Sequence, residues 1–448
     1  MTAEADSVFW QGVQQEQNSQ FQAAIQSWQQ ALRSYQAIGD RFGEIACLDN
    51  LAKTYYYLKQ YPKVIEHYQQ TLTLRQELDD KTGVASVLSS VGTAYKSLGQ
   101  YQQAIEYYQQ ELTLRRELGD FQHEAYCLTD LGLAYHSIGQ YQQAIETLQQ
   151  ALTPYKKIGD RSGEGGSLCN LGIAYRALGQ YQQAIDHYQL ALPILQAIGH
   201  RQFEANTLTG LGDTYYCMEE YQKAIEYYQQ AIAIQEEIGD KTGVVNLLCS
   251  VGKAYKFLGL HQQAIESYQQ ELILRRELND FQHEAYCLSD LGLAYKALGE
   301  YQQAIETLHQ ALIPYKKIGD RSGEGGSLCN LGNAYRALGQ YQHAIDHYQL
   351  ALPILQAIGH RQFEANTLIG LGNTYYCLKQ YQQAIEYYQQ ALTLRQELGD
   401  LKGQSYSLTY LGKAYYYLKQ YQQAIECYQQ ELTLQQELGD RKQESRCL

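Results

Sequence analysis

The chain has 448 residues and a formal net charge of −13, and 45% of its residues are apolar. The acidic balance argues against nucleic acid as the main partner, because phosphate binding would need a basic surface. No apolar run is long enough to cross a bilayer, and the N-terminus MTAEADSVFWQG lacks the features of a signal peptide. Ten cysteines without a CxxC pair fit a reducing compartment. We therefore expect a cytoplasmic protein without nucleic-acid or membrane partners.

A pattern of forty residues recurs along the whole chain. Within each copy the apolar residues follow helical spacing twice, only five prolines interrupt the sequence, and strand patterns are absent. We predict an all-α fold of eleven two-helix repeats, the first of them cap-like. The predicted repeats are 1–40, 41–80, 81–120, 121–160, 161–200, 201–240, 241–280, 281–320, 321–360, 361–400 and 401–440. Residues 441–448 begin a further helix, so either they act as a makeshift cap or the natural protein continues.

The repeat 321–360 illustrates how each helix pair is built. An acidic N-cap, here Asp320, precedes the first helix, helix A, although His200 and His360 replace it in two repeats. Turns are predicted at Gly339 and Gly359. The expected core stripes are Leu328, Leu331, Gly332, Tyr335 and Leu338 on helix A, and Ala344, Ile345, Tyr348, Ala351 and Leu352 on the second helix, helix B. One repeat cannot bury both of its faces alone, so we predict a single elongated solenoid over residues 1–448.

A longer period of four repeats is also present. Residues 154–208 and 314–368 differ only at Ile173/Asn333 and Gln183/His343. Four prolines fall inside helix B of these copies, where each removes a backbone hydrogen bond at a cost of about 3 kcal/mol. We therefore predict kinked or shortened helices there, or helices that end early in a looser turn. These prolines are Pro154, Pro193, Pro314 and Pro353.

The pattern L-G-x-A-Y-x-x-L-G-x-Y-x-x-A-I-x-x-Y-x-x-A-L resembles the tetratricopeptide repeat over essentially the whole chain. In one repeat the matching residues are Leu331, Gly332, Tyr335, Gly339, Tyr341, Ala344, Tyr348 and Ala351. The stretch GDRSGEGGSLCNLGNAYRALGQY (319–341) is similar to the longer-helix variants in Pins-type adaptors, rapsyn and kinesin light chains. The Tyr- and Gln-rich composition is similar to cyanobacterial arrays, some of which carry a caspase-like peptidase. The resemblance implies a right-handed superhelix whose A helices line a concave channel for a peptide or partner protein.

Helix A also carries a second stripe, at positions 326, 329, 330, 333, 336 and 337, which is the candidate groove. Two of its positions define columns along the array. Column 336 reads Tyr56, Lys96, His136, Arg176, Tyr216, Lys256, Lys296, Arg336, Tyr376 and Tyr416. Column 333 reads Lys53, Thr93, Leu133, Ile173, Asp213, Lys253, Leu293, Asn333, Asn373 and Lys413. Together they hold eight Lys or Arg residues and one Asp, a bias that favours an acidic ligand.

The columns have a functional and a structural interpretation. Tyrosines and asparagines, with Asn330 beside the columns, offer hydrogen bonds to an extended peptide, and the basic residues select carboxylates. Alternatively, this is a solvated helix face on which Lys and Arg are good helix formers. The resemblance implies a ligand role for Asn333 and Asn373, whose NLGN-like motif matches the groove asparagines of Pins-type adaptors, but Ile173 departs from it. No complete carboxylate clamp of the chaperone-binding members is present, so an EEVD-type ligand is not expected.

No pattern for catalysis or cofactor binding is found. The sequence contains no G-x-S-x-G, no GxxxxGK[ST] and no dinucleotide fingerprint. His343 and His347 have the spacing of a metal pair but no evident third ligand, so we expect neither metal nor cofactor. The sequence favours a non-enzymatic scaffold that binds a protein or peptide. The alternatives are the sensor region of a larger effector, such as a peptidase or signalling protein, and self-association through the terminal repeats.

Overall fold

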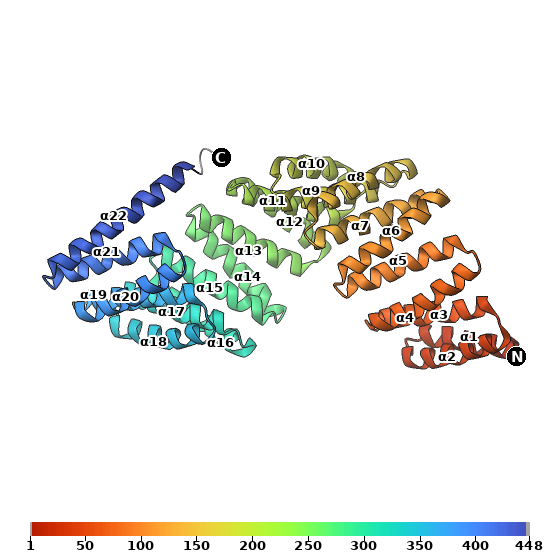
Figure 1. Cartoon of the computed structure of the whole chain (residues 1–448), viewed down its shortest axis with the longest axis horizontal. Helices are drawn as coiled ribbons and strands as arrows, with labels where there is room; N and C mark the ends of the chain where they lie inside the picture. The colour runs from red at the N-terminus through yellow and green to blue at the C-terminus, as the bar shows by residue number, and fades with distance from the viewer. Residues whose placement is uncertain (1, 445–448) are drawn as a thin grey trace. The chain divides into compact units, whose positions relative to one another are not determined.

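The structure, a computed structural model, describes residues 2–444 and is built of helices joined by short turns (Figure 1). Among the described residues the chain forms 22 helices and no strand, which confirms the predicted all-α fold and the forty-residue spacing of helix pairs. Close contacts divide the chain into two compact halves, an N-terminal half of residues 1–234 and a C-terminal half of residues 235–448. Each half is described by itself below.

The helices alternate between A (odd numbers) and B (even numbers). In the N-terminal half they are α1 (Thr2–Gln17), α2 (Phe21–Ile38), α3 (Arg41–Tyr57), α4 (Tyr61–Glu77), α5 (Lys81–Ser97), α6 (Tyr101–Leu118), α7 (Phe121–Ser137), α8 (Tyr141–Ile158), α9 (Arg161–Ala177), α10 (Tyr181–Ala197) and α11 (Arg201–Cys217). The next helix, α12 (Tyr221–Ile238), contains the boundary between the halves.

The C-terminal half continues the same alternation. Its helices are α13 (Lys241–Phe257), α14 (His261–Glu277), α15 (Phe281–Leu298), α16 (Tyr301–Ile318), α17 (Arg321–Ala337), α18 (Tyr341–Ala357), α19 (Arg361–Cys377), α20 (Tyr381–Glu397), α21 (Leu401–Tyr417) and α22 (Tyr421–Glu444).

The helix ends are set by local signals that the sequence predicts. Asp320 accepts a hydrogen bond from the Gly323 amide at 2.9 Å, and the other aspartates that precede an A helix do the same. His200 and His360 make no such cap bond. The turns need a left-handed residue, and Gly339 supplies it with a φ of 81°.

Most residues of the predicted core stripes are buried, but Tyr335 and Leu352 are only partly buried. Leu331 and Tyr348 are fully buried, and Gly332 is needed because a Cβ there would lie 2.5 Å from the Tyr348 ring. Leu338, however, lies one residue beyond α17 and is 38% exposed. Conversely, Gly326 and Cys329 of the predicted groove stripe are buried.

Contacts between successive A helices explain the burial of Gly326 and Cys329. α7 packs on α9 and α9 on α11 in the N-terminal half, and α15, α17, α19 and α21 form a similar series in the C-terminal half. The side of α17 that faces α19 is therefore covered by α19 and is not accessible to a ligand. Among the described residues, B helices make no comparable contact with one another. From α7 to α11 and from α15 to α21, the A helices thus form a continuous surface.

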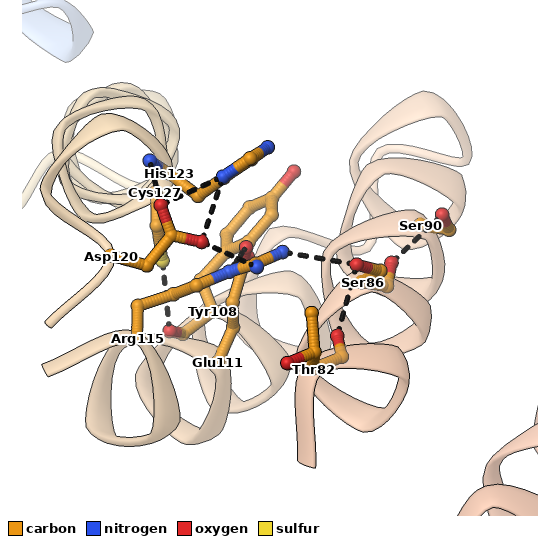
Figure 2. A network of polar contacts seen from close by, with 9 residues as sticks. All are labelled: Thr82, Ser86, Ser90, Tyr108, Glu111, Arg115, Asp120, His123 and Cys127. Atoms are coloured by element: carbon orange, nitrogen blue, oxygen red, sulfur yellow. Dashed lines mark hydrogen bonds and ion pairs between the residues drawn. The ribbon is translucent and has the colours of Figure 1, made fainter. Parts of the chain in front are cut away.

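A buried polar joint, which the sequence analysis missed, ties successive repeats together (Figure 2). Arg115 near the end of α6 pairs with Asp120, the N-cap of α7, at 2.9 Å, and with Glu111 on its own helix at 3.3 Å. Its other terminal nitrogen donates to Ser86 on α5 at 3.3 Å. Arg275, the equivalent residue four repeats further along the chain, makes the corresponding contacts with Glu271, Asp280 and Asn246. Such a paired and hydrogen-bonded charge tolerates burial.

The prolines do not shorten their helices, so the prediction of shortened or early-ending helices is wrong, whereas the predicted kinks stay a prediction. Pro154 lies inside α8, which runs to Ile158, and the helices with the other three prolines likewise keep their full length. The residues just after the prolines hold the last turn in place, since Tyr155 and Leu195 are almost completely buried. Packing therefore offsets the missing hydrogen bond.

The last described helix also differs from its predicted boundary. α22 runs through Gly439 to Glu444, where the pattern predicts a turn and a new helix from 441. Continuing the helix satisfies backbone groups that a turn would leave open. Residues 445–448 of that predicted helix lie outside the described residues. No described helix is long and apolar enough to span a membrane.

Candidate functional site

Columns 333 and 336 run along the A helices of both halves, including those that form the continuous surface. Their side chains are exposed or half-buried in every described repeat except at Asn373, which is 9% exposed. From α7 to α11 and from α15 to α21 successive A helices contact each other, so neighbouring members of a column there come from adjacent helices. The structure therefore brings the predicted residues together in a series within each half.

Members of column 333 accept hydrogen bonds from a buried tyrosine of helix B. The Tyr348 hydroxyl donates to Asn333 Oδ1 at 2.9 Å, and the Tyr388 hydroxyl donates to Asn373 Oδ1 at 2.8 Å. Asp213 accepts in the same way from Tyr228 at 2.9 Å. The oxygen of each asparagine is thus engaged in a hydrogen bond within the helix pair, and its NH₂ group can donate to other partners.

This tyrosine loses its acceptor where column 333 changes. Ile173 cannot accept a hydrogen bond, and the buried Tyr188 hydroxyl has no partner among the described residues. The same holds for Tyr268 in the repeat that carries Lys253. Thr93 keeps a polar contact, with its hydroxyl 3.2 Å from that of Tyr108. Column 333 therefore has a packing role that the sequence analysis did not identify.

Three basic residues of column 336 are neutralised by an aspartate of the next repeat. Lys96 Nζ lies 2.6 Å from Asp130 Oδ1, and Lys256 Nζ lies 2.9 Å from Asp290 Oδ1. Arg176 Nη2 lies 3.5 Å from Asp213 Oδ2. These pairs reduce the positive charge that the columns suggest, because each cation already has a counter-ion.

Lys296 and Arg336 form the exception. Among the described residues, no carboxylate lies within ion-pair distance of either side chain. Asn330 occupies the position of Asp130 and Asp290, and Asn373 occupies the position of Asp213. Burial lowers the pKa of Lys296, and the nearby charge of Arg336 lowers it further. Positive charge is therefore uncompensated at this one part of column 336.

The tyrosines of column 336 lie edge-on against the first tyrosine of their own helix B. This geometry favours aromatic pairs and holds the rings at the surface. The ring-centre distances are 5.5 Å for Tyr56–Tyr61, 5.3 Å for Tyr216–Tyr221, 5.5 Å for Tyr376–Tyr381 and 5.6 Å for Tyr416–Tyr421.

His136 occupies a comparable place, with its ring centre 5.3 Å from that of Tyr141. Burial lowers the pKa of His136, and Arg176 lowers it further. Lys53, Lys253 and Lys413 are exposed, so solvent screens their charges more than that of Lys296.

Two cavities contain residues of the columns, one in each half. The N-terminal cavity, of about 310 Å³, is lined by Lys53, Tyr56, Tyr57, Tyr68, Ser89, Ser90 and Thr93. The C-terminal cavity, of about 360 Å³, is lined by Cys329, Asn330, Asn333, Arg336, Phe363, Asn366, Ile369, Gly370, Asn373, Arg395, Gly403 and Tyr406. A cavity of about 410 Å³ between α4, α5 and α6 contains no residue of either column.

Histidines near column 336 pack with aromatic rings. His343 and His347 flank Tyr335 at ring-centre distances of 5.3 and 4.9 Å, and His309 lies 5.4 Å from His347. Across the residues that the structure describes, no three His, Cys, Asp or Glu side chains are placed to hold a metal ion. Sequence spacing could not reveal His309, because it belongs to the preceding repeat.

The tetratricopeptide repeat family matches residues 10–77, 83–157, 165–237, 243–313, 323–397 and 363–437. No curated protein sequence matches the chain. Among solved structures, a signal transduction ATPase with a tetratricopeptide repeat sensor from Pyrococcus horikoshii is similar, with 17% identity and a TM-score of 0.56 over 80% of this chain and 54% of that chain.

Two further structures resemble the chain less closely. The quorum sensor NprR from B. thuringiensis has 16% identity and a TM-score of 0.47 over 79% of this chain and 99% of its own. A kinesin light chain of P. anserina with nearly identical repeats has 24% identity and a TM-score of 0.38 over 43% of this chain and 94% of its own.

Proposed function

Since the chain belongs to the tetratricopeptide repeat family, we propose that it is a non-enzymatic scaffold whose A-helix surface binds an extended segment of a partner protein. The observation that carries this proposal is the position of the two cavities, each lined by residues of columns 333 and 336. Their volumes fall in the range of ligand pockets, roughly 300–1,000 Å³. Only tetratricopeptide repeats are matched along the chain, and such repeats typically bind proteins or peptides.

The chemistry of the surface supports an extended segment. Tyr56, Tyr376 and Tyr416 present partly exposed rings, while Asn330 and Asn333 present amide groups. Aromatic rings supply apolar area, and amides can pair with the backbone of a bound strand.

Site-specific photo-crosslinking tests this proposal. A photoreactive amino acid replaces Lys296 or Tyr376 in column 336, and in a control protein it replaces Gln342, which is exposed on helix B. After irradiation in native lysate, we expect the two column variants to trap the same partner and the Gln342 variant to trap none. Equal trapping from position 342, or trapping from that position alone, would place the partner on another face and overturn the proposal.

The alternative is that these repeats form the sensor region of a larger effector. The relative from P. horikoshii is itself described as an ATPase with a repeat sensor, and the repeats here cover 54% of it. In that case the same surface would receive the signal. A reading frame that continues past Leu448 into a catalytic domain would favour the effector, and a stop codon would favour the scaffold.

A further inference from the structure

The C-terminal cavity is lined without acidic residues. It lies among α17, α19, α20 and α21, and its lining residues include Arg336 and Arg395. Arg395 is already paired with Asp400 and with the Asn366 side-chain oxygen. Arg336 is half-buried and has no carboxylate partner among the described residues, and its Nε, like that of Arg176, has no hydrogen-bond partner. A half-buried guanidinium without a counter-ion is stabilised when a carboxylate accepts its hydrogen bonds.

Neutral amide donors stand beside Arg336. The structure gives the Asn330 side chain no hydrogen-bond partner among the described residues. The Asn333 side-chain oxygen accepts a hydrogen bond from the Tyr348 hydroxyl. The only described hydrogen-bond partner of its NH₂ group is the Cys329 sulfur, at 3.9 Å. Hydrogen-bond donors thus outnumber acceptors at this part of the cavity wall, and a carboxylate is an acceptor-only group that can use several donors at once.

The duplicated block supplies a natural comparison within the N-terminal half. Arg176 corresponds to Arg336, and Asp213 corresponds to Asn373. Asp213 lies 3.5 Å from Arg176 and also accepts from Tyr228, so the protein's own carboxylate fills the position. In the C-terminal half Asn373 keeps the tyrosine bond but brings no charge. The two copies therefore differ by one internal counter-ion.

A second cation strengthens the contrast. Lys296 on α15 precedes Arg336 in column 336, and no described carboxylate pairs with it. Four repeats earlier in the chain, His136 occupies the position equivalent to Lys296. Burial and the Arg336 charge lower the pKa of Lys296, and a bound carboxylate would offset the repulsion between these two cations.

We infer that the cavity beside Arg336 binds the side-chain carboxylate of an Asp or Glu within the partner segment, and that the Arg176 counterpart does not. The guanidinium provides a charge-assisted hydrogen bond, and the amides of Asn330 and Asn333 provide further donors. This inference rests on the proposed function, because it assigns one acidic position of the segment to one cavity. It also locates the acidic preference in the C-terminal half.

Selection from a random peptide library displayed at a phage-protein N-terminus tests the inference. The targets are the full-length chain, its Asn373→Asp variant and its Asp213→Asn variant. We expect the unmodified chain to enrich peptides with a recurrent Asp or Glu. Asn373→Asp should lose that preference, because the new carboxylate would pair with Arg336. Asp213→Asn should keep it, since that change leaves the Arg336 cavity intact.

Affinity measurements on one enriched peptide complete the test. By fluorescence polarisation, replacing its acidic residue with the matching amide should weaken binding to the unmodified chain about tenfold or more. The same replacement should change binding to Asn373→Asp by much less. Asp213 already occupies the equivalent position four repeats earlier, where it accepts a hydrogen bond from Tyr228. The Asn373→Asp variant is therefore expected to fold, and circular dichroism and the thermal midpoint will verify this.

The outcomes separate the inference from the function on which it rests. If the unmodified chain enriches no peptide, the proposed groove function fails, and the inference fails with it. If it enriches peptides without an acidic residue, the groove function stands and the carboxylate assignment is wrong. Retention of the acidic preference by Asn373→Asp, or its loss in Asp213→Asn, would also overturn the assignment.

Discussion

At the scale of single residues, a change from carboxylate to amide alters the electrostatics of a duplicated surface. Asp213 and Asn373 both accept a tyrosine hydroxyl, so their packing role is the same. Only Asp213 also neutralises an arginine, Arg176. Because column 333 performs both tasks, its members cannot be interpreted as ligand contacts alone. The N-caps illustrate a purely structural role of the same carboxylate chemistry.

Replacing Asp80 with Ala should lower the free energy of unfolding by about 1 kcal/mol. Asp80 accepts from the Gly83 amide at 2.9 Å and pairs with Arg75 at 2.7 Å. Urea unfolding at neutral pH measures the loss. His360→Ala is the matched control, because His360 makes no cap bond and its removal should cost little. Equal losses in the two variants would contradict the capping role.

The difference between the unmodified chain and Asp80→Ala should depend on pH. The Gly83 amide hydrogen bond lowers the pKa of Asp80 below its ordinary value of 3.8. The folded state therefore binds this proton less tightly than the unfolded state, and the stabilisation is present above pH 3.8. It should be lost as the pH falls through the folded-state pKa. A difference that grows in acid would contradict this sign.

At the scale of the helix pair, close approach of A and B depends on a missing side chain. Gly332 on α17 faces the Tyr348 ring on α18. Equivalent glycines face a tyrosine in several other repeats, whereas Gly132 and Gly292 face a leucine. The tyrosine hydroxyl then reaches column 333 on helix A. One aromatic residue thus fills the core of the pair and positions a residue of the candidate surface.

Gly332→Leu should overpack this contact and destabilise the protein by about 1–3 kcal/mol or more. A Cβ at this position would already lie 2.5 Å from Tyr348, and the glycine has no room to relax. Gln342→Leu is the control, since Gln342 is exposed on α18 and bonds only locally to Asp346. Thermal midpoints compare the two variants. Similar midpoints would mean that the assigned helix faces are wrong.

At the scale of the whole molecule, stability is distributed along the chain. Among the described residues, helices with extensive contacts are neighbours one or two places apart in sequence. Repeat proteins of this kind gain stability from each repeat and from each interface between neighbours. The polar joints at Arg115 (Figure 2) and at Arg275 contribute to such interfaces within their halves. No contact between distant repeats is needed to hold a half together.

A fragment of residues 240–448 should therefore fold without the rest of the chain. It retains the N-cap Asp240, which accepts from Gly243 at 3.0 Å, and it retains helices α13–α22. Circular dichroism should show a helical fragment with a cooperative thermal transition. A fragment of residues 261–448, which lacks α13 and exposes the buried face of α14, should be less stable. An unstructured 240–448 fragment would contradict nearest-neighbour stabilisation.

The sequence by itself determined the features that depend on neighbouring residues along the chain. Helix periodicity, the caps at residues such as Asp320 and the turns at residues such as Gly339 could be predicted because their partners lie within a few positions. The sequence also indicated the two columns, whose use as a binding site is still a prediction. It wrongly allowed a shortened helix at Pro154, because local propensity does not include the packing of Tyr155.

Only the tertiary structure decided which members of the columns are available to a ligand. The aspartates that neutralise Lys96, Lys256 and Arg176 come from the next repeat. The tyrosines whose hydroxyls donate hydrogen bonds to Asn333 and Asn373 come from helix B. A count of charges in a column cannot include partners from another helix, because ion pairing depends on distance in space. Packing of one A helix on the next likewise closed Cys329 and left Arg336 at the cavity wall.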